Sequence, residues 1–157
     1  MNKKWLKKIY EKIVPSTTQW LPRYYTVLRL IERGEGLVLD ASCGTGDITI
    51  ELKKKGVKVI GVNISKEEIL LARKKAEEEG LKIDFVIGDL TNAPFKDKTF
   101  SQIISLDTLE HIKDDDSVFQ EFARILKRSG KLILSVPYSA TNSAKLFWEQ
   151  RILRKLI

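Results

Sequence analysis

Four short runs of small or polar residues stand directly after apolar segments of the chain, and they hold the side chains best suited to binding a ligand. The first run extends from Asp40 to Asp47 and contains Gly44 and Gly46. Because glycine has no Cβ, the backbone there can turn sharply and approach a ligand closely. The first amides of a following helix would point at the same place. This spacing alone is a weak signal, since many strand–helix turns carry glycine only for packing.

Asn63, Asp89 and His111 follow the next three apolar segments. Asn63 lies 17 positions after Gly46, and its amide offers an acceptor oxygen and two donor hydrogens that can bond a diol. The Asp89 carboxylate can accept a hydrogen bond from an exocyclic amine. His111 is the only histidine, and an imidazole suits general-base work near neutral pH. The structural alternatives are a turn-favouring Asn, a solvated loop Asp and a histidine that packs or caps a loop.

The pattern around these residues predicts alternating strands and helices. Expected strands cover 37–40, 57–62, 83–87, 100–106 and 131–136, and expected helices cover 47–55, 65–79 and 118–127. Ser65 and Glu68 form a capping box at the start of the second helix. Single helices between short strands imply right-handed βαβ units and a parallel sheet. The near-continuous apolar strands favour a doubly wound α/β fold with helices on both faces, whose ligand sits beyond the carboxyl ends of the strands.

Further helices are expected at both ends of the chain. One covers 3–14 and stops at Pro15, a second runs from about 22 to 33, and a third covers about 143–157. With 157 residues the chain fits one domain. We therefore predict a helical cap over 1–34, a ligand-binding core over 35–138 and a C-terminal helix over 139–157.

Positive charge gathers at the two ends of the chain, whose total is +7. Residues 1–33 carry a net charge of +6 and residues 145–157 carry +3, whereas 34–144 carry −2. Such ends could meet nucleic acid or lipid headgroups, or could simply be solvated helix faces. The single cysteine, Cys43, excludes an internal disulfide and, with one histidine, a zinc site rich in Cys and His. The absence of a long apolar run or a secretory signal predicts a cytoplasmic protein, peripheral to a membrane at most.

Five segments, in this order, resemble the motifs of the class I S-adenosylmethionine-dependent methyltransferases, in their small-molecule branch. They are Val38–Gly46, Val59–Ser65, Ile87–Leu90 with Ala93–Phe95, Leu106–Ile112, and Phe122–Leu132. The likeness covers about residues 36–138. Each motif is modest, but their order and spacing together are specific. The resemblance implies a Rossmann-like fold, S-adenosylmethionine as cofactor and no metal.

The resemblance also implies roles for individual residues. Gly44 and Gly46 would shape the turn under the methionine part, and Asp40 would lie near its amino group. Asn63 would hold the ribose, and Ile64 would pack on the adenine. The implied cofactor-binding residues are Asp40, Ala41, Ser42, Gly44, Thr45, Gly46, Asn63, Ile64, Gly88, Asp89, Leu90 and Leu106. His111 is the candidate general base near the site of methyl transfer.

Three departures from the family pattern stand out. Ser42 replaces the first glycine of the first motif, and Asn63 replaces the acid that grips the ribose. The family sheet has seven strands, whereas the segment after Ser139 reads as a helix, so the last two strands are expected to be missing. The fifth strand, with Leu132 and Leu134, would then be an open edge that invites pairing with a second copy of the chain.

The likeness narrows the acceptor to a small molecule or a lipid. The Asp/Asn-Pro-Pro-Tyr/Phe signature of DNA amino-methylating enzymes is missing, and Cys43 lies in the cofactor turn, so nucleic acid is disfavoured. Trp20, Tyr24 and Tyr25 could face the acceptor from the N-terminal helices or belong to the core. Two other functions remain open. One is an NAD-type oxidoreductase, whose third glycine would fall at Thr49, and the other is a non-catalytic RNA-binding module with basic ends.

Overall fold

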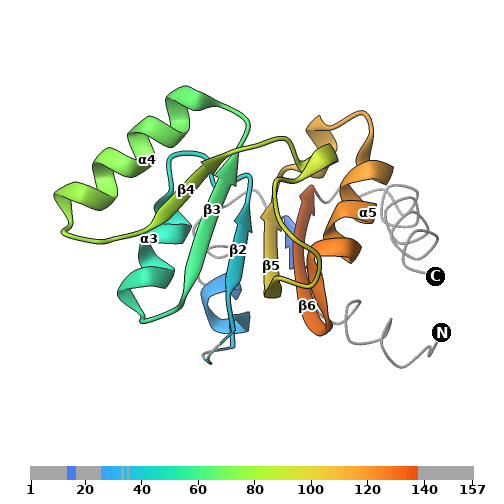
Figure 1. Ribbon diagram of the computed structural model, residues 1–157, viewed down its shortest axis with the longest axis horizontal. Coiled ribbons are helices and arrows are strands. Elements are labelled where there is room, and N and C mark those ends of the chain that lie inside the picture. Colours follow the sequence, from blue (N-terminus) through green and yellow to red (C-terminus); the bar gives the residue numbers. More distant parts are fainter. Residues whose placement is uncertain (1–13, 17–25, 33, 35, 138–157) are drawn as a thin grey trace.

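The computed structural model describes residues 14–16, 26–32, 34 and 36–137 (Figure 1). Their strands form one six-stranded sheet in the order β1-β6-β5-β2-β3-β4, and every neighbouring pair is parallel. In chain order the elements are β1 (Val14–Ser16), β2 (Val38–Ala41), α3 (Asp47–Lys54), β3 (Val59–Asn63), α4 (Lys66–Glu78), β4 (Asp84–Ile87), the 3-10 helix η1 (Leu90–Asn92), β5 (Phe100–Leu106), the 3-10 helix η2 (Leu109–His111), α5 (Asp115–Ile125) and β6 (Leu126–Pro137). Residues 26–30 form a short helix before β2. The predicted α/β fold with a parallel sheet is confirmed.

The order of the strands reverses at β2. From β2 the chain runs outward through β3 to β4 and then returns to β5, which pairs with the other side of β2. In this register Ala41, the last residue of β2, lies beside Val62 of β3 and Ser105 of β5. The carboxyl ends of these strands therefore open together at one edge of the sheet, where ligands of such folds bind.

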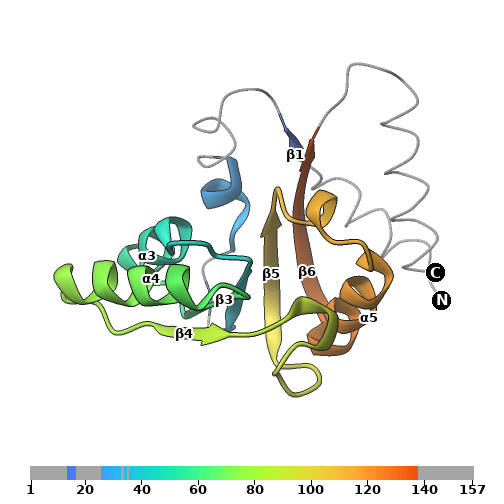
Figure 2. The same cartoon turned by 90° about the horizontal axis from the view of Figure 1, so that it is seen from above.

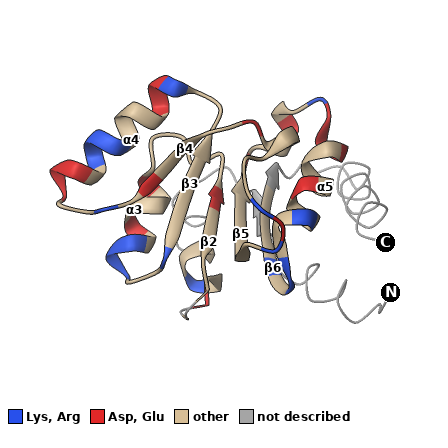
Figure 3. Ribbon diagram, in the orientation of Figure 1, with Lys and Arg blue, Asp and Glu red and all other residues tan. Residues whose placement is uncertain are grey.

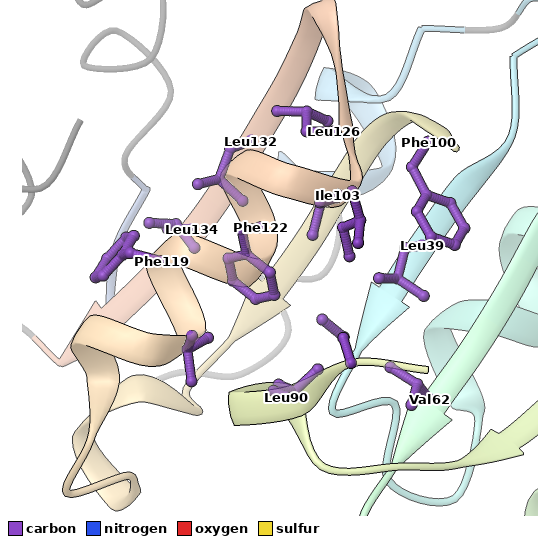
Figure 4. Packing of buried hydrophobic residues seen from close by; sticks show 14 of the residues in the cluster. Leu39, Val62, Leu90, Phe100, Ile103, Phe119, Phe122, Leu126, Leu132 and Leu134 are labelled. Carbon is purple, nitrogen blue, oxygen red and sulfur yellow. The ribbon is translucent and has the colours of Figure 1, made fainter. Parts of the chain in front are cut away.

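Each face of the sheet carries its own apolar cluster, because consecutive residues of a strand point to opposite sides. The cluster against α3 and the helix at 26–30 consists of Val27, Ile31, Val38, Leu52, Val57, Val59, Ile104 and Ile133. The cluster against α5 includes Leu39, Phe100, Ile103, Phe119, Phe122, Leu126, Leu132 and Leu134 (Figure 4). Figure 2 shows α3 and α4 together beside β3 and β4, with α5 at the other end of the sheet. The expectation of helices on both faces is confirmed.

The start of α4 follows only half of the predicted capping box. Ser65 is the N-cap, and its hydroxyl oxygen accepts the backbone N–H of Glu68 at 3.2 Å. The Glu68 carboxylate, however, accepts a hydrogen bond from the side-chain amide of Asn63 at the end of β3. The reciprocal side-chain bond of a capping box is therefore replaced by a bond that joins α4 to the preceding strand.

The edge of the sheet differs from the prediction. Val14–Ser16 form a strand, although the predicted helix over 3–14 includes Val14 and stops at Pro15. β1 pairs with Ser135–Pro137 of β6, so the prediction of an open edge is wrong at these three residues. Proline lacks a backbone N–H and so signals the end of a helix, but an edge strand tolerates it. A three-residue strand that contains a proline is therefore hard to recognise from the sequence.

The segment between α5 and the main part of β6 also differs from the prediction. Phe100 pairs with Leu126 and Gln102 pairs with Lys131, so the intervening residues 127–130 form a bulge. A Cβ on Gly130 would lie 2.7 Å from the Leu126 side chain, which folds over it. The predicted helix over 118–127 instead begins at Asp115, where Asp114 caps it, and ends at Ile125.

The remaining terminal predictions lie outside the described residues. They are the helix at 143–157, the aromatic residues Trp20, Tyr24 and Tyr25, and all but the last residue of the helix at 3–14. In the part of the chain that is described, charge lies mainly on helices and loops rather than on the strands (Figure 3). None of the helices described in this chain is both long and apolar enough to cross a membrane.

We predict that Gly46→Ala destabilises the fold strongly. Gly46 has a φ of +83°, and a Cβ there would lie 2.9 Å from the Ala72 Cβ and 3.0 Å from the Phe85 ring. The left-handed backbone and the overpacking should together cost about 2–4 kcal/mol of unfolding free energy in urea titrations. Gly56→Ala is the matched control, since Gly56 has a φ of +81° but no atom within 4 Å of its added Cβ. Equal losses for the two variants would contradict the packing argument.

Candidate functional site

A cavity of about 680 Å³ lies where the strand ends meet. The segments that follow β2, β3, β4 and β5 all contribute to its wall. The lining residues are Ser42, Gly44, Asn63, Ile64, Glu68, Gly88, Asp89, Leu90, Thr91, Leu106, Asp107, Thr108, His111, Ile112, Lys113 and Asp114. The volume suits a small organic molecule of the size of a nucleoside cofactor.

The loop after β2 has a left-handed backbone at three of its residues. The φ angles are +65° at Ser42, +52° at Gly44 and +83° at Gly46. The backbone N–H of Cys43 donates to Val62 O at 3.0 Å, which ties the loop to the end of β3. A left-handed φ favours glycine, which gives a physical reason for the glycine that the family motif has where this chain has Ser42.

The second half of this loop is held against α4. The Lys75 ammonium donates to Thr45 Oγ1 at 2.8 Å and to Asp47 Oδ1 at 2.9 Å. Gly46 lies against Ala72 of the same helix. Thr45 and Gly46 are therefore not among the residues that line the cavity, although the resemblance implied both as cofactor-binding residues.

Asp40 and Ala41 are buried beneath the loop and do not line the cavity either. The Thr49 hydroxyl donates to Asp40 Oδ2 at 2.6 Å. Burial raises the pKa of Asp40 to about 6, and the hydrogen bonds from Thr49 oppose that rise. Burial and the nearby Asp40 carboxylate also raise the pKa of the Cys43 thiol, which makes this cysteine a poor nucleophile.

The end of β3 brings a polar pair and an apolar side chain to the cavity. Asn63 is only 6% exposed, and its Nδ2 donates to the carboxylate of Glu68. The next residue, Ile64, is 70% exposed at the same cavity, which is unusual for a large apolar side chain. An exposed isoleucine beside hydrogen-bonding groups can cover one face of a flat ring.

The segment after β4 supplies a short turn. Asp89 Oδ1 accepts the backbone N–H and the hydroxyl of Thr91, both at 2.8 Å. A Cβ on Gly88 would lie 2.9 Å from the Pro94 ring, so the turn packs closely on the loop that follows. Leu90 is buried beside it and lines the cavity.

Arg124 and Glu121 of α5 hold that loop in place. The Arg124 guanidinium donates to Ala93 O at 3.0 Å and to Phe95 O at 2.7 Å. Glu121 accepts the backbone N–H of Ala93 at 2.8 Å and also a hydrogen bond from Arg124. The bond from Arg124 is the main reason why the pKa of Glu121 lies below its usual range. Neither residue lines the cavity, so both act as supports.

The end of β5 forms the opposite wall. Asp107 has a φ of +47°, and its Oδ1 accepts the Ser135 hydroxyl of β6 at 3.0 Å. His111 follows in η2, where its side chain is exposed, and it lines the same cavity. The predicted candidate base therefore lies across the cavity from the polar pair at the end of β3.

Most of the predicted site residues come together in this cavity. They are Ser42, Gly44, Asn63, Ile64, Gly88, Asp89, Leu90, Leu106 and His111, and their individual roles remain predictions. Sequence reasoning missed the wall residues Glu68, Thr91, Thr108, Ile112, Lys113 and Asp114. Glu68 could have been found, since it lies in the first turn of the helix after Asn63, on the same side as the strand end.

We predict that the burial of Asp40 makes the fold less stable as the pH rises. Because the pKa is raised above its ordinary 3.8, the protonated form favours folding, and this contribution is lost as the pH rises through about 6. Relative to the wild type, Asp40→Asn should gain roughly 2 kcal/mol of unfolding free energy between pH 4 and pH 6.5, measured by urea titration. Asp84→Asn, on an exposed carboxylate, is the control. Parallel pH profiles for wild type and Asp40→Asn would contradict this account.

Comparison with known proteins agrees with this geometry. Residues 39–134 match the family described as a methyltransferase domain. The chain is 38% identical over 111 residues to the ubiquinone biosynthesis O-methyltransferase of Nitrosococcus oceani, a match that covers 70% of this chain and 47% of that protein. The chain spans 34% to 47% of the length of four such curated relatives.

Two solved structures are similar. The PH0226 protein from Pyrococcus horikoshii OT3 has a TM-score of 0.70 at 28% identity, covering 96% of this chain and 72% of that one. The [4+2]-cyclase SpnF has a TM-score of 0.66 at 26% identity, covering 69% and 41%. The family match spans more than half of the chain and includes the motifs at the strand ends, whereas nothing supports the oxidoreductase or RNA-binding alternatives. The chain belongs to the class I S-adenosylmethionine-dependent methyltransferases.

Proposed function

We propose that the cavity binds S-adenosylmethionine and that the protein catalyses transfer of its methyl group to a small organic acceptor. The observation that carries this proposal is the meeting of four strand ends around one cavity, with the left-handed loop of Ser42 and Gly44 at the end of β2. S-adenosylmethionine supplies an electrophilic methyl group on a sulfonium cation. Catalysis then requires mainly that the chain align an acceptor with that group and exclude water.

The residues of the cavity fit this cofactor. Ser42 and Gly44 would lie under the methionine part, and Asn63 would bind the ribose. Ile64 and Leu90 would cover the adenine, with Asp89 at its edge and Leu106 contacting the cofactor from β5. Asp40 is buried with Thr49, so we place it under the loop as a support rather than against the ligand.

The charge of the cavity also favours a cationic ligand. Its wall carries the carboxylates of Glu68, Asp89, Asp107 and Asp114 against the single ammonium of Lys113. Opposite charge in a concave, partly buried site raises the local concentration of a cation. This acidic wall contrasts with the net charge of +7 of the whole chain.

The acceptor side of the cavity lies around η2, where His111 is the proposed general base. It lines the cavity, its side chain is exposed, and an imidazole can take a proton from an acceptor hydroxyl or amine. Leu106 and Ile112 offer apolar contact to the acceptor. The similarity to a ubiquinone biosynthesis O-methyltransferase supports an aromatic hydroxyl, free or carried on a lipid, as the acceptor group.

Three further proposals rest on the sequence. The basic segments 1–33 and 145–157 would attract the cytoplasmic face of an anionic membrane, which co-sedimentation with anionic vesicles at low salt tests. A second copy could pair with β6 beyond the three residues that β1 covers, and light scattering at high concentration tests this dimer. We also propose that the protein works in the cytoplasm.

We predict that the protein binds S-adenosylhomocysteine, the product of methyl transfer. Isothermal calorimetry on the purified chain should show a 1:1 complex, and NAD(H) should give no heat under the same conditions. Structural similarity to a [4+2]-cyclase shows that a related fold need not imply methyl transfer, so labelled S-adenosylmethionine and a panel of phenols and quinols should follow. The absence of any S-adenosylhomocysteine binding would defeat the proposed function.

We predict that His111→Asn lowers kcat by about 100-fold or more, because the acceptor proton loses its base. The affinity for S-adenosylhomocysteine should stay within twofold, since the imidazole lies on the acceptor side of the cavity. Steady-state kinetics with the best acceptor of the panel and calorimetry measure the two effects. A kcat within threefold of the wild type would assign His111 a structural role only.

A further inference from the structure

The residue at the end of β3 is neutral, although the family resemblance expects an acid there. In the structure a negative charge lies next to this residue, because the Asn63 amide donates to the carboxylate of Glu68 in the first turn of α4. We infer that Glu68 binds the ribose hydroxyls of the cofactor and supplies the negative charge that the strand end lacks. This inference rests on the proposed function and assigns a binding role to a residue outside the family motif.

Both members of the pair lie at the cavity. Asn63 is 6% exposed and Glu68 is half-buried, and each contributes to the cavity wall. The carboxylate is therefore neither free in solvent nor buried out of reach of a ligand. Its position is fixed twice, through the amide of Asn63 and through its own backbone N–H, which donates to the Ser65 hydroxyl.

The hydrogen bond between Asn63 and Glu68 also determines which acceptor atoms of the two side chains remain available to a ligand. A carboxylate only accepts hydrogen bonds, so the Asn63 amide must turn its NH₂ group toward Glu68 and its oxygen elsewhere. One carboxylate lone pair is then used, and the others remain for a ligand. A ribose diol carries two O–H donors, which a carboxylate and an amide oxygen can both accept, and bonds to the charged group are the stronger ones.

The neighbouring acid provides an internal contrast. Glu67 is exposed, and its carboxylate accepts the Ser65 hydroxyl at 3.1 Å. It is not among the residues of the cavity wall. Both acids occupy the first turn of α4, where a negative charge stabilises a helix in the same way. Glu68 differs from Glu67 in lying at the cavity and in accepting the Asn63 amide, so Glu67→Gln is the control for loss of a first-turn charge alone.

The first test measures binding of S-adenosylhomocysteine and of its 2′,3′-dideoxy analogue by calorimetry on the full chain. Glu68→Gln should bind S-adenosylhomocysteine about 10- to 100-fold more weakly, as expected for lost hydrogen bonds to a charged group. Glu67→Gln should stay within twofold of the wild type. The wild type should prefer S-adenosylhomocysteine over the dideoxy analogue, and Glu68→Gln should lose most of that preference. A merely structural Glu68 would weaken both ligands equally, which would overturn the inference.

The second test moves the charge. Asn63→Asp alone restores the family residue but places two carboxylates in contact, so it should weaken binding rather than improve it. Asn63→Asp combined with Glu68→Gln returns one charge and one amide in exchanged positions. We expect the double variant to bind S-adenosylhomocysteine within about threefold of the wild type. Adding the losses of affinity of the two single variants would predict much weaker binding.

The outcomes separate this inference from the proposed function. If the wild type fails to bind S-adenosylhomocysteine, the proposed function fails. If the wild type binds and Glu68→Gln binds within twofold of it, only the role of Glu68 is wrong. Tighter binding by Asn63→Asp than by the wild type would place the ribose at the strand end itself and would likewise overturn the inference.

Discussion

The ring of Phe85 sets the shape of the ligand-binding edge, because it lies against the backbone of two other segments. A Cβ at Gly61 of β3 would come within 2.7 Å of this ring, and a Cβ at Gly46 would come within 3.0 Å. Phe85 is itself 4% exposed, within a cluster that includes Ile69 and Ala72 of α4. Close packing of this kind leaves no space for a side chain, so the loop after β2 has to follow the path that puts Gly44 at the cavity.

Hydrogen bonds from side chains of α4 and α5 then hold these loops in place. Lys75 fastens the loop after β2 to α4, while Arg124 and Glu121 fasten the loop after η1 to α5. None of these three side chains lines the cavity. A ligand site built this way has its contact residues on short turns and its rigidity in the helices, so the turns can carry strained backbone such as that of Ser42 and Asp107.

The sequence predicted the sheet well where local pattern and global fold agree. β2, β3 and β5 follow short, mainly apolar runs separated by helix signals, and such runs favour a parallel sheet that is covered on both faces. The prediction failed at β1 and at residues 127–130, for a shared reason. Pairing of Val14–Ser16 with the far end of the chain is a long-range contact, and the bulge depends on the register between β5 and β6. Neither the pairing of β1 nor the bulge produces a periodic pattern of apolar residues in the sequence.

The candidate site, like the sheet, could be predicted from the sequence only in part. A sequence motif fixes which loop approaches the ligand, but the direction of each side chain depends on packing, and this separates Asp40 from Glu68. Asp40 belongs to the recognised motif yet points into the interior at Thr49, whereas Glu68 lies outside the motifs of the resemblance and reaches the cavity. Binding of a cofactor depends on where a charge lies in space rather than on its position in the sequence. A neutral residue at the strand end and an acid one helical turn later can therefore present the same charge that the family usually holds at a single position.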